Sequence, residues 1–286
     1  MNSTEYKFNW EETIQFIRTQ DKYKNLVKTA YFEEDLVLNI ERYQSSPEFI
    51  ETLQILKSQA PNAKNILDIG CGNGITSICF ALNGYQVTAV EPDPSATIGA
   101  GAIRALKEHY KLENIEIYEC YAEDIPYEEE SFDVVYFRQA MHHAYDLNKF
   151  VAQSARVLKK GGLLFTSRDH VLFDESEKEA FLAGHPLQEF YGGENAFTEK
   201  QYVAAMNNAG LQVEQVIKTF DNVINCSIEK GLKLNKQKKI KSIYLSFKPI
   251  VGFLLPQKIK TKMDALLNEE LTPAGRMYSF LARKPR

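Results

Sequence analysis

The chain has 286 residues, of which 44% are hydrophobic and 25% charged, so it can bury a sizeable core and has the composition of an ordinary globular protein. Its first residues, MNSTEYKFNWEET, contain no basic start followed by an apolar stretch. No apolar run approaches the roughly 18 residues of a membrane span. These features predict a cytoplasmic protein. The four cysteines lack C-x-x-C spacing and a nearby histidine partner, which argues against a metal site or a disulfide framework and favours buried free thiols.

The net charge of −4 is unevenly distributed. Ten lysines and one glutamate between Ile228 and Lys262 give that stretch +9, so the rest of the chain carries −13. A broadly basic surface is absent from the remainder, which argues against a nucleic-acid partner.

Helical patterns come first along the chain. Residues 11–45 read as amphipathic helices, and a further helix is expected from Pro47 to Pro61 with an apolar stripe of Phe49, Leu53 and Leu56. Strands and helices then alternate. Strands are predicted at 65–69, 86–90, 115–120, 132–137 and 162–167, and helices at 74–82, 95–110 and 147–158.

This alternation, with strands that are continuous apolar runs, predicts a doubly wound α/β fold around a mostly parallel sheet. Past residue 167 we expect helices at 174–183 and 198–209, a strand near 211–220 and a last strand at 277–284. The predicted organisation is an N-terminal helical cap (1–60), an α/β core (61–220), a lysine-rich insertion or lid (221–275) and a final core strand (276–286).

The stretch NILDIGCGNG places three alternating glycines directly after the first strand of the core. In such sheets the first strand-to-helix turn brings bare backbone close to a bound nucleotide. The spacing G-x-G-x-G differs from the G-x-G-x-x-G of dinucleotide sites, and no Lys-Ser or Lys-Thr follows as in a P-loop. Asp68 would repel a pyrophosphate but suits a ligand that carries an ammonium group and a positive sulfur.

Glu91 ends the second strand, 21 residues after Gly70, at the distance where an acid reaches ribose hydroxyls. A carboxylate that accepts from a diol specifies unphosphorylated ribose. A site that binds both a cationic group and a ribose predicts S-adenosylmethionine as the ligand.

Four ordered segments, ILDIGCGNG, VEPDP, AEDIPYEEESFDVVYFRQAMHH and RVLKKGGLLF, resemble the successive motifs of class I S-adenosylmethionine-dependent methyltransferases, most closely the small-molecule group of ubiquinone and menaquinone enzymes. The resemblance covers about residues 60–170 and implies a seven-stranded Rossmann-like sheet. It also implies which residues bind the cofactor: Asp68, Gly70, Cys71, Gly72, Gly74, Glu91, Pro92, Tyr121, Ala122, Glu123 and Arg138.

Within this set the resemblance assigns Asp68 and the glycines to the methionine part, Glu91 to the ribose and Pro92 to the adenine. Tyr121 stands where many relatives have an aspartate that accepts from the adenine amino group. Either Glu123 replaces that acceptor, or Tyr121 lines the ring in another way. Taken singly, the glycine turn could be only a tight connection, Asp68 a helix cap and Glu91 a solvated strand end.

Methyl transfer to a hydroxyl is helped by a base that removes a proton, a task suited to histidine. His142 follows the fourth core strand and His170 the fifth, so these two are the catalytic candidates. The alternative for the His142–His143 pair is structural, with one ring packed on the sheet and the other capping the next helix. Arg168 either binds an anionic acceptor or pairs with Asp169.

The loop GHPLQEFYGGENAF offers His185, Tyr191 and Glu194 to the acceptor, or is an ordinary loop. The lysine-rich segment is either a lid with solvated lysines or a contact to a membrane surface or lipid-linked acceptor.

The sequence therefore predicts a methyltransferase that acts on a small molecule, at oxygen or nitrogen rather than carbon. Two rivals remain open: a non-catalytic S-adenosylmethionine-binding sensor or scaffold, and a nicotinamide-dependent oxidoreductase. No resident metal is predicted, and the oligomeric state is left open.

Overall fold

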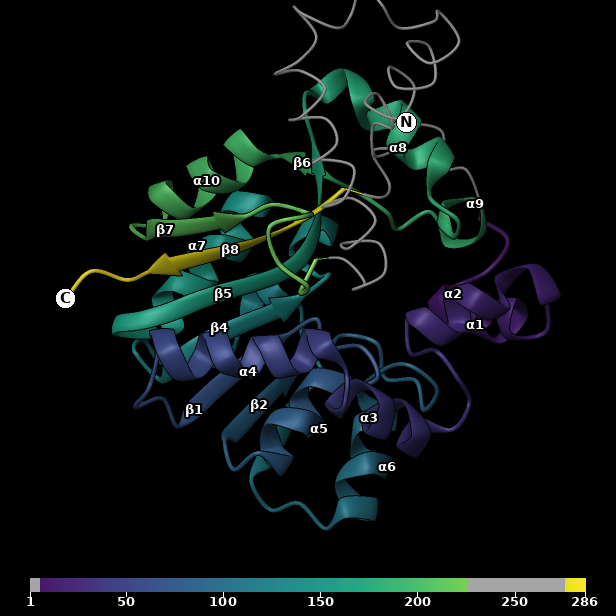
Figure 1. The fold of residues 1–286 in the computed structure, drawn as a ribbon, viewed down its shortest axis with the longest axis horizontal. Coiled ribbons are helices and arrows are strands. Elements are labelled where there is room, and N and C mark those ends of the chain that lie inside the picture. The colour runs from purple at the N-terminus through teal and green to yellow at the C-terminus, as the bar shows by residue number, and fades with distance from the viewer. Residues whose placement is uncertain (1–5, 226–275) are drawn as a thin grey trace, which may run out of the picture.

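A computed structural model describes residues 6–225 and 276–286, and it has a central twisted sheet with helices on both faces (Figure 1). The strands follow the order β3-β2-β1-β4-β5-β8-β7, with β6 paired to β5. Their bounds are β1 Asn65–Ile69, β2 Gln86–Val90, β3 Ile115–Tyr118, β4 Phe132–Arg138, β5 Leu158–Leu172, β6 Phe197–Thr198, β7 Gln212–Ile217 and β8 Met277–Arg283.

Strands β1 to β5 pair with one another in parallel, whereas β8 is antiparallel to both β5 and β7. The doubly wound, mostly parallel sheet is therefore confirmed. The sheet has eight strands among the described residues where seven were predicted, because the two-residue β6 pairs with the end of β5.

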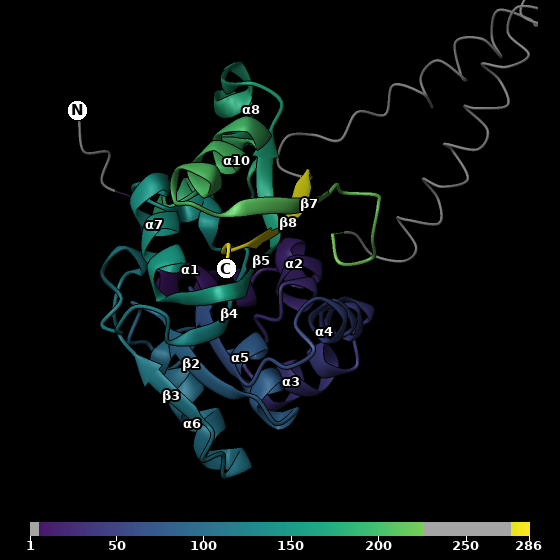
Figure 2. The same ribbon diagram turned by 90° about the vertical axis from the view of Figure 1, so that its left-hand side faces the viewer.

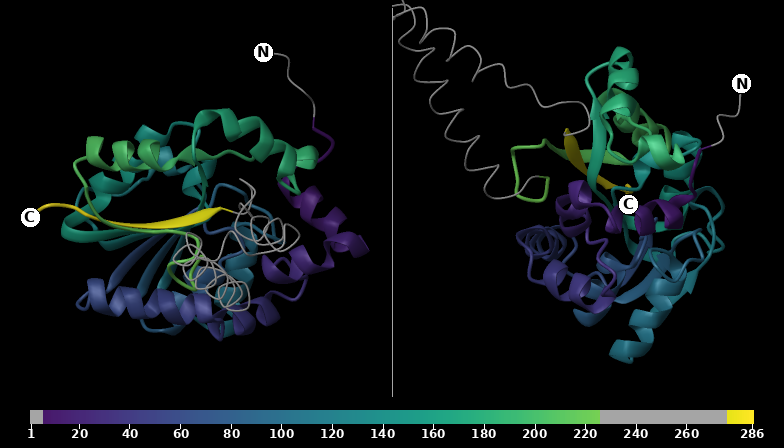
Figure 3. Two further views of the ribbon diagram at one scale, coloured as in Figure 1. Left: turned by 45° about the horizontal axis from the view of Figure 1, so that its top comes forward. Right: turned by 90° about the vertical axis from the view of Figure 1, so that its right-hand side faces the viewer.

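Two helical layers cover the sheet, as Figures 2 and 3 show from the side. Residues alternate across β1, so that Ile66 packs with one layer while Leu67 and Ile69 pack with the other. The first layer contains α3 Leu36–Gln44, α4 Pro47–Gln59, α5 Ile75–Leu82 and α6 Ala100–Tyr110. The second contains α7 Leu147–Val157 and α10 Glu199–Asn208.

The N-terminal helices form a cap beyond the carboxyl ends of the parallel strands (Figure 1). It consists of α1 Trp10–Arg18, η1 Asp21–Tyr23 and α2 Lys24–Thr29. Asn9 starts α1 with a capping box that includes Glu12. The cap buries Ile14 and Ile17 against Ile98 and against Phe190 of α9 Gln188–Tyr191. It therefore joins the β2–α6 connection to the loop region after β5.

Several element bounds differ from those predicted. Helix α6 begins at Ala100 instead of residue 95, because the backbone N–H of Ala100 donates to the Asp93 carbonyl and residues 93–99 form a turned connection. Strand β5 extends to Leu172, through a register shift between Thr166 and Asp169. The connection between β5 and α10 contains η4 Glu175–Glu177, α8 Lys178–Gly184 and α9.

The lysine-rich stretch 228–262 lies outside the described residues, so its prediction as a lid or membrane contact stays a prediction. Within 6–225 and 276–286, none of the helices combines the length and apolar character needed to cross a membrane.

Candidate functional site

The turn after β1 needs glycine for two different reasons. Gly70, Gly72 and Gly74 have φ angles of +63°, +56° and +79°, in the left-handed region that side chains disfavour. A Cβ on Gly70 would lie 2.7 Å from Ala140 Cβ, and one on Gly74 would lie 2.8 Å from Ile103 Cγ1. At Gly72 the nearest atom would be the Ile98 carbonyl at 3.7 Å. Packing thus fixes the outer glycines, while the middle one leaves open backbone.

Asp68 lies buried beneath this turn, at the end of β1. Its Oδ2 accepts hydrogen bonds from the hydroxyls of Thr76 and Ser77 in the first turns of α5. Its Oδ1 is buried and has no hydrogen-bond partner among the described residues. Burial raises the pKa of Asp68 to about 6. The sequence analysis did not predict these two hydroxyls, although their position just after the glycines could have indicated them.

Glu91 connects the end of β2 to the glycine turn. Its Oε2 accepts from the backbone N–H of Gly72 at 2.7 Å, and its Oε1 accepts from the N–H of Asp93 at 3.0 Å. Burial raises the pKa of this carboxyl to about 7. Glu91 is therefore a buried acid at the strand end rather than a solvated one, and it touches the turn directly.

The remaining predicted cofactor residues lie around these two acids. Cys71 is a buried thiol directed at the Val90 carbonyl, and Pro92 is exposed just after Glu91. Tyr121 is 55% exposed, whereas Ala122 and Glu123 are buried in η2 Ala122–Asp124. Glu123 Oε1 has no hydrogen-bond partner within the part of the chain that the structure describes. This buried, unpaired oxygen fits the predicted alternative in which Glu123 replaces the missing aspartate.

Arg138, at the end of β4, belongs to a buried ion-pair network. Its guanidinium contacts Glu48 of α4 through Nε–Oε1 at 2.6 Å and Nη2–Oε2 at 3.3 Å, and it stacks on Tyr43. Arg168 contacts Glu48 Oε2 at 3.1 Å. The predicted Arg168–Asp169 pair is wrong. Strand β5 has a register shift at this point and Arg168 has a φ of +64°, and there Arg168 contacts Glu48 while Asp169 turns towards His142.

His142 lies in η3 Met141–His143 and is almost completely buried. Its Nδ1 lies 3.1 Å from Asp169 Oδ1, and Asp169 also accepts from the Thr166 hydroxyl at 2.6 Å. Both oxygens of Asp169 already accept a hydrogen bond, Oδ1 from the backbone N–H of His142 and Oδ2 from the Thr166 hydroxyl, so this contact places the imidazole proton on Nδ1 and leaves a lone pair on Nε2. Burial lowers the pKa of His142 well below its usual value. The ring is therefore a neutral lone-pair donor.

The other predicted residues of this side gather around His142. The His170 ring centre is 4.8 Å from that of His142 and 5.4 Å from that of His185. His170 is buried, and its Nδ1 has no hydrogen-bond partner among residues 6–225 and 276–286. Glu194 Oε2 lies 4.0 Å from His142 Nε2. The structure thus brings both catalytic candidates and the loop residues to one place.

His143 does not have the capping role that the alternative interpretation gave to one ring of the pair. Asp146 caps α7 by accepting from the N–H of Lys149, while His143 Nδ1 lies 2.9 Å from the Gly193 carbonyl. The loop after α9 is therefore held against η3, and the histidine cluster is built from three separate segments.

Comparison with known proteins agrees with this architecture. The model of a family described as "Methyltransferase domain" matches residues 67–166, the stretch that contains the glycine turn, Glu91 and the histidine pair. The match covers a little over a third of the chain, and the fold and the glycine turn around it are similar to those of class I S-adenosylmethionine-dependent methyltransferases.

Curated relatives match over part of their length. The ubiquinone biosynthesis O-methyltransferase of Bradyrhizobium sp. (strain ORS 278) is 35% identical over 102 residues, which are 36% of this chain and 38% of that protein. The uncharacterized methyltransferase YcgJ of Bacillus subtilis is 29% identical over 148 residues, 50% of this chain and 57% of that protein. The chain spans between 38% and 57% of the length of such relatives.

Solved structures share the fold over most of the chain. The YcgJ structure from Bacillus subtilis has a TM-score of 0.54 at 18% identity and covers 83% of this chain and 99% of that one. Geranyl diphosphate C-methyltransferase from Streptomyces coelicolor A3(2), solved with S-adenosyl-L-homocysteine, has a TM-score of 0.57 at 14% identity and covers 87% and 84%.

Proposed function

We propose that this protein transfers a methyl group from S-adenosylmethionine to a hydroxyl or amino group of a small molecule. The observation that carries the proposal is that two groups of residues lie together at one end of the sheet. A glycine turn with buried carboxylates lies after β1 and β2, and a cluster of neutral histidines lies after β4 and β5.

The residues after β1, β2 and β3 fit the cofactor in three respects. Asp68 Oδ1 and Glu123 Oε1 are buried oxygens without a hydrogen-bond partner among the described residues. Burial of such oxygens costs free energy unless a hydrogen-bond donor or a cation contacts them. Gly72 leaves backbone open beside Glu91, whose carboxylate can accept from a ribose diol. When bound, the cofactor supplies a methyl group on a positively charged sulfur.

In this proposal Glu91 binds the ribose and Asp68 attracts the cationic methionine part. Ala122 and Glu123 border the adenine, with Pro92 and Tyr121 at its open side. Arg138 acts through Glu48, because its guanidinium is already paired there. Cys71 and the three glycines shape the turn.

On the acceptor side, His142 or His170 is the proton acceptor. Asp169 orients the His142 ring and leaves Nε2 with its lone pair, an arrangement that suits a base for a hydroxyl. Proton removal assists attack by oxygen or by an ammonium nitrogen. Transfer to oxygen or nitrogen rather than carbon is proposed on this ground alone, because the matched proteins include both an O-methyltransferase and a C-methyltransferase and do not distinguish between these acceptors.

The cap of α1, η1 and α2 limits the size of the acceptor and the access of water. It packs Ile14 and Ile17 onto Phe190 and Ile98, at the same end of the sheet as both halves of the site. Exclusion of water strengthens the electrostatic interactions of a displacement reaction. A small or lipid-linked acceptor that enters beneath this cap is the proposed substrate class.

The test is incubation of the full chain with S-adenosylmethionine labelled in its methyl group and with fractionated cell extract. We expect label to appear in a low-molecular-weight compound, on oxygen or nitrogen. Tight cofactor binding without label transfer to any fraction would contradict an enzyme and favour a sensor.

A further inference from the structure

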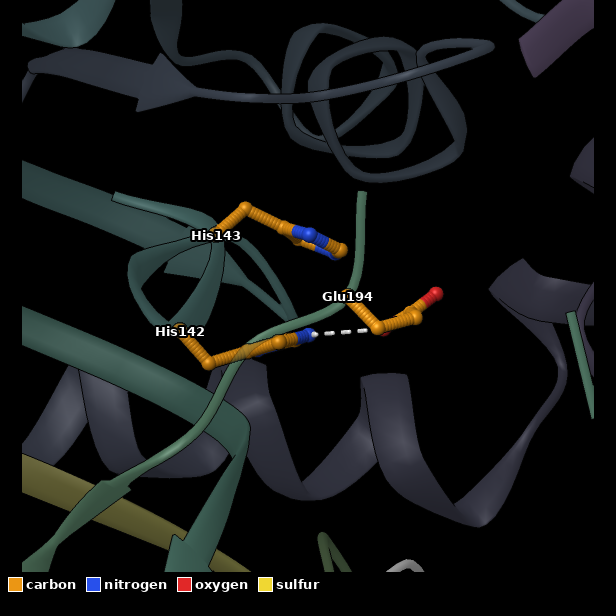
Figure 4. Close-up of side chains that lie close together, drawn as sticks. All are labelled: His142, His143 and Glu194. Carbon is orange, nitrogen blue, oxygen red and sulfur yellow. Dashed lines mark ion pairs between the residues drawn. The ribbon is translucent and has the colours of Figure 1, made fainter. Parts of the chain in front are cut away.

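Three side chains with metal-binding atoms converge on the acceptor side. His142 and His143 come from η3, and Glu194 comes from the loop after α9 (Figure 4). One ligand atom of each lies within 4.8 Å of the others, and His142 Nε2 is 4.0 Å from Glu194 Oε2. The two imidazole ring centres are 4.1 Å apart. Residues that are distant in sequence thus form one compact donor set.

Both imidazoles have a second partner that fixes their tautomer. Asp169 Oδ1 lies 3.1 Å from His142 Nδ1, and the Gly193 carbonyl lies 2.9 Å from His143 Nδ1. A carbonyl oxygen cannot donate, and Asp169 already accepts the N–H of His142 and the hydroxyl of Thr166. Protons on both Nδ1 atoms leave lone pairs on both Nε2 atoms. Metal-binding histidines are oriented by carboxylates or carbonyls in this way.

Glu194 is also held in place, and no lysine or arginine among the described residues pairs with it. The Tyr191 hydroxyl donates to its Oε1, which leaves Oε2 facing His142. Its side chain is 4% exposed, and its ion-pair partners among the described residues are histidines alone, His142 and His185. A buried carboxylate between uncharged imidazoles is unfavourable unless a cation or a proton joins it. The unpartnered, buried Nδ1 of His170 adjoins the same cluster.

We propose that His142, His143 and Glu194 bind one divalent transition-metal ion. Two imidazoles and one carboxylate form the donor set of catalytic zinc sites and of non-haem iron sites, whereas Mg²⁺ and Ca²⁺ prefer oxygen ligands throughout. Three protein ligands leave coordination positions open. Only the role of the ion rests on the proposed function. In that role the ion polarises the acceptor oxygen. His142 is then a metal ligand, and His170 is the remaining proton acceptor.

The test uses the full chain without an affinity tag, stripped of metal by a chelator and titrated with Zn²⁺ in a calorimeter. We expect one ion per chain, and an absorption band typical of tetrahedral or five-coordinate Co²⁺ when Co²⁺ is the probe. His143→Ala and Glu194→Gln should each weaken Zn²⁺ binding by about tenfold or more. His109→Ala, which removes the histidine of α6 outside the cluster, is the matched control and should bind like the wild type.

The outcomes separate this inference from the proposed function, because cofactor affinity is measured on the same proteins. No Zn²⁺ binding, binding that survives both site variants, or tighter binding of Mg²⁺ than of Zn²⁺ would overturn the metal site. Zn²⁺ binding that depends on His143 and Glu194, together with failure to bind S-adenosylmethionine, would support the metal site and contradict the methyltransferase proposal.

Discussion

The two halves of the proposed site are built in different ways. On the cofactor side, most of the proposed ligand residues lie in one turn and at the end of the next strand, and the contact between Gly72 N–H and Glu91 at 2.7 Å connects these neighbouring parallel strands. On the acceptor side, His142, His170 and Glu194 come from three separate segments, which are held together by packing and by the hydrogen bonds of His142 with Asp169 and of His143 with the Gly193 carbonyl. The first half presents backbone and carboxylates, and the second presents neutral imidazoles. In the proposed function, the first half matches the charge of the cofactor and the second half accepts a proton.

The largest expected effect concerns Arg138, which ends β4, the strand between β1 and β5. Arg138→Met removes one partner of the buried pair with Glu48, and loss of such a partner costs about 3 to 5 kcal/mol in the free energy of unfolding. Urea denaturation measures this change. An unchanged unfolding free energy combined with weak cofactor binding would instead make Arg138 a direct cofactor ligand.

His142→Ala should lower turnover by roughly 10²-fold or more, because the variant loses the oriented Nε2 lone pair. The cofactor dissociation constant should stay near that of the wild type, since His142 belongs to the acceptor half. Steady-state kinetics and calorimetry on the same preparation check both expectations. Full activity would return His142 to a structural role.

Glu91→Ala should weaken cofactor binding by about 1 to 3 kcal/mol, through loss of hydrogen bonds to a charged acceptor. Calorimetric titration with S-adenosylhomocysteine measures it, and Glu116→Ala, an exposed position on the neighbouring strand β3, is the control. Equal affinities for Glu91→Ala and the wild type would remove Glu91 from the site.

The smallest expected effect is a pH dependence confined to the cofactor half. Burial, with Asp93 and Asp68 nearby, raises the pKa of Glu91 to about 7, and burial raises that of Asp68 to about 6. The cofactor favours the ionised forms, so its affinity should fall by about three- to tenfold as the pH drops from 8 to 6. Glu91→Gln should flatten the part of this dependence near pH 7, and an equally steep profile in that variant would assign the titration elsewhere.

The difference between the halves also explains which features of the site could be predicted from the sequence and which could not. Parallel strands with apolar runs, the glycine turn and the acid after β2 are local patterns, and the fold and the position of Glu91 follow from them. The partners of Arg138 and Arg168 could not be predicted, because Glu48 is far away in the chain and only packing brings α4 to the strand ends. The same holds for the approach of Glu194 to His142, although both residues were candidates on separate grounds.

A crystal structure with S-adenosylhomocysteine bound tests the central claim most directly. We predict the ligand along residues 68–74, with its ribose hydroxyls on Glu91 and its sulfur facing the side of His142. A structure in which the turn stays empty at saturating ligand, or in which the ribose lies away from Glu91, would contradict the account.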